Sequence, residues 1–426
     1  MVAGVAHPLT KLWKSFVQPG RQEYSYYDLG PVNFVLNSNT SIKVRRDDIT
    51  LVNKRGQQLH CSHWQQVFSP GAAAANRQLC VVYLHGMGSS RCDAWSILEP
   101  TLARGASLFA LDFAGSGWSD GDYVSLGCHE ESDVETAVDY LRSSGRADEV
   151  AFWGRSMGAA TAIFRAEKDP SVAACVLDSP FSDFVELACE IANSSRVPVP
   201  KSLVKMLLRS VRAEVQKHAG FDLMNISPLK SAPASKVPAW FCTGSADDFV
   251  MPHHSTALHD AWGCTDRKIT YLEGHHRSVR PQWFHERAMD FLLLKLRTAA
   301  QSPLRQQLRA AVQAARPLPA VVKDSSDSPD AAAGVVSCVD AADVQERSLR
   351  RSRASASAEE SLRRTLRDAS EAQLNAVESM SPTSKQRHIL TQLLAFGVSD
   401  ANASKAVARC SSMEASIDWL CGEGLM

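Results

Sequence analysis

The stretch "VAFWGRSMGAATA", residues 150–162, joins an apolar run that predicts a β-strand to an alanine-rich run that predicts a helix. Between the two runs, Gly154, Ser156 and Gly158 stand at the spacing GxSxG. Glycines on both sides permit the tight turn that lifts a serine hydroxyl off a sheet, and the helix amino terminus offers backbone donors to a developing negative charge. This context of strand, turn and helix makes Ser156 a candidate nucleophile.

Short apolar runs of the same kind alternate with longer amphipathic stretches over about residues 49 to 299. Strands are expected near residues 79–85, 107–113, 149–155, 173–178, 237–243 and 267–272. Such alternation predicts an α/β fold with a mainly parallel sheet that is covered by helices on both faces. In such a sheet, ligands bind outside the carboxyl ends of the strands.

A serine nucleophile needs a base, and the base needs an orienting acid, in the chain order Ser, Asp, His. The run "WFCTGSADDFV" ends a predicted strand with Asp247 and Asp248, and "ITYLEGHHRSVRP" ends the next with His275 and His276. Both pairs of residues follow Ser156 in the required order. The spacing alone leaves open which member of each pair takes part.

The run "YLHGMGSS" ends an earlier strand, and its glycines let a backbone amide near Met87 face the nucleophile. The amide of Met157 directly follows Ser156. These two amides are the candidate donors to an oxyanion, and each is worth a few kcal/mol in a transition state. His85 is expected to hold this loop by hydrogen bonds, and Asp112 to fix the loop "DFAGSGWSDG". For Arg155 the context favours a structural ion pair over contact with a substrate carboxylate.

The composition describes a soluble globular protein. The chain has 426 residues, with 46 basic and 46 acidic side chains, so the global charge does not indicate nucleic acid as a partner. Its 11 cysteines contain no CxxC pair, which favours reduced thiols and a cytoplasmic location over a disulfide framework. No transmembrane segment or secretory signal is expected. Apolar residues within 9–17 follow one helical face, which predicts a helix packed on the main domain or, alternatively, a peripheral membrane contact.

The stretch "TGSADDFVMPHHS", residues 243–255, pairs two acids with two histidines but lacks the partners of a metal site. We therefore expect no metal and no cofactor, and we expect His253 and His254 to be exposed. Residues 182–233 exceed a simple crossover and predict a cap above the strand ends. Residues 300–384 have the composition of a largely disordered linker. Apolar spacing returns over 385–424 and is sufficient for three short helices.

Five motifs resemble those of the α/β-hydrolase superfamily, and within it the serine-aminopeptidase-like hydrolases. They are HGxGSS at 85–90, DxxGxGxSxG at 112–121, GRSMG at 154–158, DDFV at 247–250 and HxxxRP at 276–281. The resemblance covers roughly residues 10 to 299 and implies an α/β-hydrolase domain over 1–299. It also implies that Asp247 and not Asp248 is the acid, and that His276 and not His275 is the base.

The carboxyl-terminal run "LLAFGVSDANASKAVARCSSMEASIDWL" resembles a ubiquitin-associated (UBA) domain, which is a three-helix bundle. The resemblance implies a ubiquitin-binding patch made of Phe396, Gly397, Val398, Trp419 and Leu420. The alternative is a helical bundle that binds another partner.

Together these observations predict a serine hydrolase that cleaves a small acyl ester, thioester or amide through an acyl-enzyme intermediate. Ser156 attacks, His276 transfers the proton, Asp247 orients His276, and the amides of Met87 and Met157 hold the oxyanion. The carboxyl-terminal domain would bring the enzyme to ubiquitin or to ubiquitinated proteins. The competing hypothesis is a catalytically inactive adaptor with a hydrolase fold that binds ubiquitin.

Overall fold

The computed structural model describes residues 13–67, 79–193 and 201–304, together with shorter pieces farther along, chiefly 319–324, 359–365 and 399–410. The chain divides into two compact units, of which the structure describes only parts. The larger unit takes Gln18–Asp183 and Ile226–Glu359. The smaller unit takes Met1–Val17, Phe184–Asn225 and Glu360–Met426. Each unit is described by itself below.

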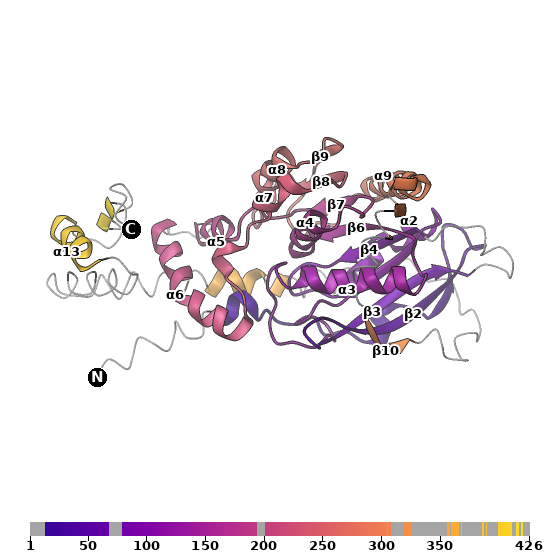
Figure 1. Cartoon of the computed structure of the whole chain (residues 1–426), viewed down its shortest axis with the longest axis horizontal. Coiled ribbons are helices and arrows are strands. Elements are labelled where there is room, and N and C mark those ends of the chain that lie inside the picture. Colours follow the sequence, from indigo (N-terminus) through magenta and orange to yellow (C-terminus); the bar gives the residue numbers. More distant parts are fainter. Residues whose placement is uncertain are drawn as a thin grey trace. The chain divides into compact units, whose positions relative to one another are not determined.

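The larger unit is built on a ten-stranded sheet with the order β1-β2-β3-β5-β4-β6-β7-β8-β9, and β10 pairs with β2 (Figure 1). The strands are β1 (Asn33–Val35), β2 (Lys43–Val52), β3 (Gln58–Gln66), β4 (Leu79–Leu84), β5 (Ser107–Leu111), β6 (Glu149–Arg155), β7 (Cys175–Asp178), β8 (Ala239–Gly244), β9 (Arg267–Leu272) and β10 (Ala320–Asp324). All neighbours from β5 to β9 in this order are parallel. The predicted parallel sheet is therefore confirmed.

The antiparallel part at one edge of the sheet was not predicted from the sequence. β1, β2, β3 and β10 pair in antiparallel fashion, and β3 joins them to β5. The alternating residues of "KVRRDDITLV", which form β2, carried a signal for this part of the sheet. β10 lies within the range 300–384, for which the composition indicated little fixed structure, and it adds an edge strand there.

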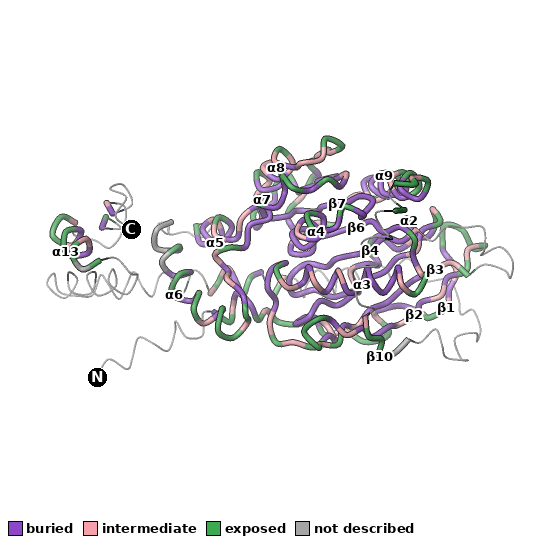
Figure 2. The backbone as a smooth tube through the Cα atoms, in the orientation of Figure 1, coloured by how far each residue is buried: buried purple, intermediate pink, exposed green. Residues whose placement is uncertain are grey.

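Helices cover both faces of the parallel strands. They are α2 (Leu98–Leu102), α3 (Glu130–Ser143), α4 (Met157–Lys168), α7 (Pro228–Ser231), α8 (Pro252–Ala261) and α9 (Gln282–Gln301). One core joins α2 and α9 to alternate strand residues such as Tyr83 and Trp153. Because side chains alternate along a strand, the intervening residues Val82 and Phe152, which are also fully buried, face the layer of α3 and α4. The central strands β4, β6 and β7 are drawn mainly in the colour of buried residues in Figure 2. The sheet is buried on both sides, as a parallel sheet requires.

The smaller unit contains α5 (Phe184–Asn193), α6 (Lys201–Ala219) and the helical residues 13–17. Phe16 packs edge-on against Phe184, and Trp13 stacks on His218. Trp13 and Phe16 are buried, and this burial favours the packed helix over the membrane contact for residues 13–17, whereas residues 9–12 lie outside the described residues. No helix in the described part of the chain is long and apolar enough to span a membrane.

Candidate active site

Ser156, Asp247 and His276 follow three strands that lie close together in the sheet, namely β6, β8 and β9. Since these strands are parallel, their carboxyl ends meet at one edge and bring the three residues together. His276 Nε2 lies 3.1 Å from Ser156 Oγ, and His276 Nδ1 lies 2.7 Å from Asp247 Oδ2. All three residues belong to the larger unit. The arrangement has the geometry of a nucleophile, a base and an orienting acid.

The turn that carries Ser156 is strained. Ser156 has φ 51° and ψ −117°, a region that non-glycine residues rarely adopt, and its amide donates to the carbonyl of Asp178 at 2.7 Å. A Cβ at Gly158 would lie 2.0 Å from the carbonyl oxygen of Leu84, and one at Gly154 would lie 2.5 Å from the carbonyl oxygen of Gly158. Both glycines are therefore needed for the close approach of α4 to the sheet, which places Ser156 above the strand ends.

The two predicted oxyanion donors flank the nucleophile. Met157 is the first residue of α4, and Met87 follows Gly86, at which a Cβ would lie 3.6 Å from Ser156 Cβ. Within the described ranges, neither amide donates to another backbone group. His85 holds the loop as expected, because its Nδ1 lies 2.8 Å from the carbonyl oxygen of Gly86 and its Nε2 accepts from the amide of Phe113 at 3.1 Å.

The structure separates Asp247 from its neighbour. Asp247 is buried, and its Oδ1 accepts from the amides of Phe249 at 3.1 Å and Val250 at 2.9 Å. Burial alone would raise the pKa of Asp247, but the nearby His276 and these amides outweigh it and lower that pKa. Asp248 is exposed. Asp247 is thus kept ionised beside the imidazole.

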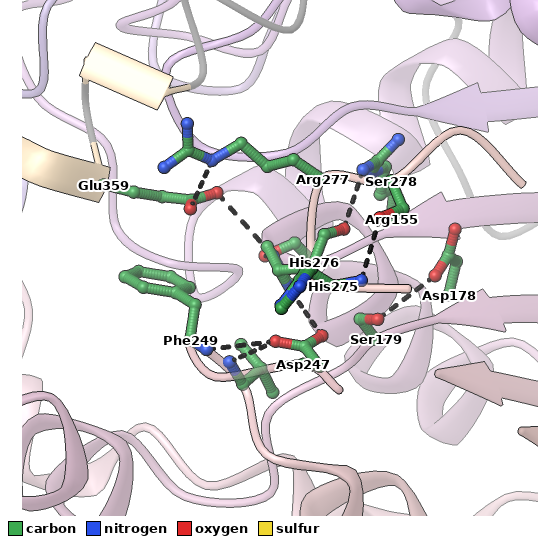
Figure 3. A network of polar contacts seen from close by, with 12 residues as sticks. Arg155, Asp178, Ser179, Asp247, Phe249, His275, His276, Arg277, Ser278 and Glu359 are labelled. Carbon is green, nitrogen blue, oxygen red and sulfur yellow. Dashed lines mark hydrogen bonds and ion pairs between the residues drawn. The ribbon is translucent and has the colours of Figure 1, made fainter. Parts of the chain in front are cut away.

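The loop that carries His276 is held by two arginines that sequence reasoning did not place there. Arg280 donates to both carboxylate oxygens of Asp178, at 2.7 and 3.0 Å, and to the carbonyl oxygen of His275 at 3.2 Å. Arg155 donates to the carbonyl oxygen of His276 at 2.9 Å (Figure 3). Arg155 thus bonds to the backbone, whereas an ion pair was favoured from the sequence. In the sequence, the available signals for the ion pair were Asp178 at the end of β7 and Arg280 in "HRSVRP".

Burial would raise the pKa of Asp178, yet Arg280 and then Arg155 lower it to about 2. Asp178 also lies at a strand end beside the nucleophile. Its carboxylate is occupied by Arg280, so it is not available to orient His276, and Asp247 takes that position.

Glu359 also reaches this region from far along the chain. Its Oε2 accepts from Arg277 Nε at 2.7 Å, and its Oε1 lies 3.9 Å from His276 Nε2 (Figure 3). The sequence placed residue 359 in the linker and gave no indication of this contact.

The expectation that both His253 and His254 are exposed was wrong for one of them. His253 is exposed, but His254 is buried, and its Nδ1 lies 2.6 Å from Ser182 Oγ. The hydroxyl offers a buried polar partner that the sequence spacing does not indicate. Asp112 fixes its loop as predicted, because it accepts from the amides of Arg91 at 2.7 Å and Trp118 at 3.0 Å.

Only part of the predicted ubiquitin-binding patch can be placed. Phe396, Gly397 and Val398 lie outside the described residues. Leu420 is buried, and the guanidinium of Arg409 lies 5.3 Å from the ring centroid of Trp419.

Comparison with known proteins agrees with this architecture. Residues 80–195 match the family model described as "alpha/beta hydrolase fold". The Escherichia coli protein YfhR, named as uncharacterized, is 21% identical over 52% of this chain and 73% of its own length. The Bacillus subtilis protein YqkD, also uncharacterized, is 24% identical over 42% of this chain and 59% of its own length.

Solved structures of esterases are among those similar to this chain. An esterase of Pyrococcus furiosus has a TM-score of 0.47 and 21% identity, and covers 66% of this chain and 98% of its own. Acetyl xylan esterase 1 of a Thermoanaerobacterium species has a TM-score of 0.47 and 16% identity, and covers 68% of this chain and 93% of its own. The family match, the mixed sheet and the helices on both of its faces define the fold of this chain as an α/β-hydrolase fold.

Proposed function

We propose that this protein is a serine hydrolase that cleaves a carboxylic ester, thioester or amide through an acyl-enzyme intermediate. The observation that carries the proposal is the continuous hydrogen-bonded line from Asp247 through His276 to Ser156, at distances of 2.7 and 3.1 Å. The line ends on a hydroxyl that a strained turn presents at the carboxyl edge of the sheet.

The geometry supports two half-reactions. In the first, His276 Nε2 takes the proton of Ser156 Oγ as the oxygen attacks the acyl carbon, and then gives that proton to the leaving group. In the second, Nε2 takes a proton from water, the resulting hydroxide attacks the acyl carbon, and the proton returns to Ser156. The amides of Met87 and Met157 stabilise the oxyanion in both steps. Asp247 keeps the proton on Nδ1 and stabilises the imidazolium.

Labelling with a fluorophosphonate probe tests this mechanism, because the probe phosphonylates an activated serine. We expect the wild-type chain to be labelled and Ser156→Ala to remain unlabelled. No labelling of the wild type, or equal labelling of both chains, would contradict the proposal and favour the inactive adaptor. A panel of acyl esters and thioesters of increasing chain length, with matched amides, then identifies the bond and the acyl group.

We further propose that residues 385–424 form a ubiquitin-binding module, which implies ubiquitinated proteins as partners. In support, α13 (Asp400–Arg409) begins at Ser399, whose side chain accepts from the amide of Asn402, and it buries Ala403 and Ala406. An NMR titration of the full chain with ubiquitin should shift the resonances of Trp419 and of Phe396. Unchanged resonances at both residues would rule out the module. The cysteines of the described residues are not joined in disulfide bonds, which supports our proposal of a reducing compartment such as the cytoplasm.

A further inference from the structure

The carboxylate of Glu359 occupies a position beside the proposed base. It accepts from Arg277 Nε at 2.7 Å and lies 3.9 Å from His276 Nε2. Glu359 is 4% exposed, although acidic side chains are almost never buried unless they are paired. The two residues of the ion pair are 82 positions apart in the sequence, so the tertiary fold and not local geometry creates this contact.

This position bears directly on the proposed reaction. Nε2 is the imidazole atom that faces Ser156 Oγ, at 3.1 Å. The leaving group and the hydrolytic water must both approach Nε2 to exchange protons with it. A carboxylate 3.9 Å away competes for that space, and its negative charge opposes the charge that develops on the oxyanion.

The same contacts show what kind of ligand fits. Arg277 supplies a cation whose side chain is 32% exposed, whereas the carboxylate it holds is almost fully covered. A guanidinium binds a carboxylate through charge-assisted hydrogen bonds, whereas a neutral group of equal size lacks the negative charge and binds more weakly. The carboxylate end of a glutamate side chain has the size of propionate.

We propose that Arg277 forms a carboxylate-binding subsite beside His276 and the nucleophile, and that Glu359 occupies this subsite as a competing ligand within the same chain. This inference rests on the proposed function, since it assigns the subsite to the same active site. It follows that small aliphatic carboxylates bind there when Glu359 is removed, and that Glu359 slows the reaction of Ser156 with neutral acyl compounds.

The first test compares Glu359→Ala and Glu359→Gln with the wild type. The matched control is Glu360→Ala, because Glu360 is the adjacent carboxylate and is exposed. We expect the rate of fluorophosphonate labelling to rise at least about fivefold in Glu359→Ala, and by less in Glu359→Gln, which keeps the shape and loses the charge. Glu360→Ala should label at the wild-type rate. Equal rates in all four chains would overturn the proposal.

The second test measures binding directly and does not depend on turnover. Propionate is titrated into the full chain carrying Ser156→Ala with Glu359→Ala, and chemical shifts of the histidine rings are followed by NMR. We expect saturable shifts of the His276 ring with propionate, none with the isosteric neutral compound propionamide, and a loss of the propionate response when Arg277→Ala is added. Propionate shifts that persist without Arg277, or the absence of any propionate shift, would overturn the subsite.

The two tests separate this inference from the proposed function. If the wild type is not labelled, the serine hydrolase proposal fails, and the propionate titration still decides whether the subsite exists. If the wild type is labelled but Glu359→Ala labels no faster, the hydrolase proposal stands and the competing role of Glu359 fails. Thermal melting of each variant checks that its fold is retained.

Discussion

Asp247 and Asp248 are adjacent in the chain, yet one side chain is buried beside His276 and the other is exposed. Asp247 lies within hydrogen-bond distance of the imidazole, and two backbone amides fix its other oxygen. The doublet in the sequence could not distinguish them by spacing. The resemblance to the α/β-hydrolase superfamily selected Asp247 over Asp248, and the tertiary contacts give the physical reason for that choice.

We expect Asp247→Asn to lower kcat by about 10³- to 10⁴-fold, because an amide no longer holds the proton on Nδ1 or stabilises the imidazolium. Asp248→Asn is the matched control and should stay within about twofold of the wild type, since surface substitutions of this kind have little effect. Steady-state hydrolysis of a chromogenic ester measures both. Equal losses in the two variants would contradict the assignment of Asp247.

At the scale of elements, the loop after β9 owes its conformation to Arg280 and Arg155, which donate to the backbone carbonyls of His275 and His276. The planar guanidinium group of Arg280 holds several acceptors at once, which an ammonium group cannot do in the same geometry. The loop is thereby fixed to the end of β7 through Asp178. We regard Arg280 as a positioning residue, because it donates to backbone carbonyls, to Asp178 and to the hydroxyl of Ser179.

Arg280→Lys should lower kcat about tenfold while KM stays within about twofold, because the imidazole is displaced but the acyl pocket is kept. A purely structural role would instead lower the melting temperature and leave the kcat of the remaining folded enzyme unchanged. Active-site titration with a fluorophosphonate, combined with thermal melting, distinguishes these outcomes. An unchanged kcat per titrated site would contradict the positioning role.

The contact of α4 with the sheet depends on a glycine. A Cβ at Gly158 would lie 2.0 Å from the carbonyl oxygen of Leu84, and this backbone atom cannot move away cheaply. We expect Gly158→Ala to lower the free energy of unfolding by roughly 2 kcal/mol or more, as overpacking in a core does. Gly20→Ala is the control, because nothing lies within 4 Å of its added Cβ, and it should leave stability unchanged. Urea denaturation followed by circular dichroism measures both, and equal midpoints would contradict the prediction.

At the scale of the whole molecule, the buried pair of Asp178 and Arg280 links stability to pH. The pKa of Asp178 is lowered to about 2 from 3.8, so the folded state binds this proton less readily than the unfolded state. The stabilisation by this carboxylate is therefore present above about pH 4 and is lost as the pH falls toward 2.

We compare the wild type with Asp178→Asn by urea denaturation at several pH values. The difference in unfolding free energy between the two chains should shrink by about 1 kcal/mol between pH 5 and pH 3. In this range Asp178 takes up its proton in the unfolded state, where its pKa is 3.8, but stays mostly ionised in the folded state, where its pKa is about 2. The variant leaves Arg280 buried without its partner, and this lowers the unfolding free energy of the variant by an amount that does not depend on the Asp178 proton. A difference that stays constant over this pH range would contradict the lowered pKa.

Local patterns determined much of this protein. Apolar runs followed by amphipathic runs predicted the parallel strands and their helices, and the spacing of Gly154, Ser156 and Gly158 placed the nucleophile at a turn. These features depend on neighbours in the chain, so the sequence alone specifies them. The same reasoning missed β1 to β3 and β10, which pair in antiparallel fashion at the other side of the sheet.

Only the tertiary structure decided which charged groups meet. Asp178 with Arg280, and Arg277 with Glu359, are pairs whose members lie 102 and 82 positions apart. Neither pair leaves a periodic signal, because a salt bridge depends on where two side chains end in space and not on their spacing in the chain. The sequence therefore identified the candidate nucleophile, base and acid, and the fold determined how the imidazole is held and which carboxylate lies beside it.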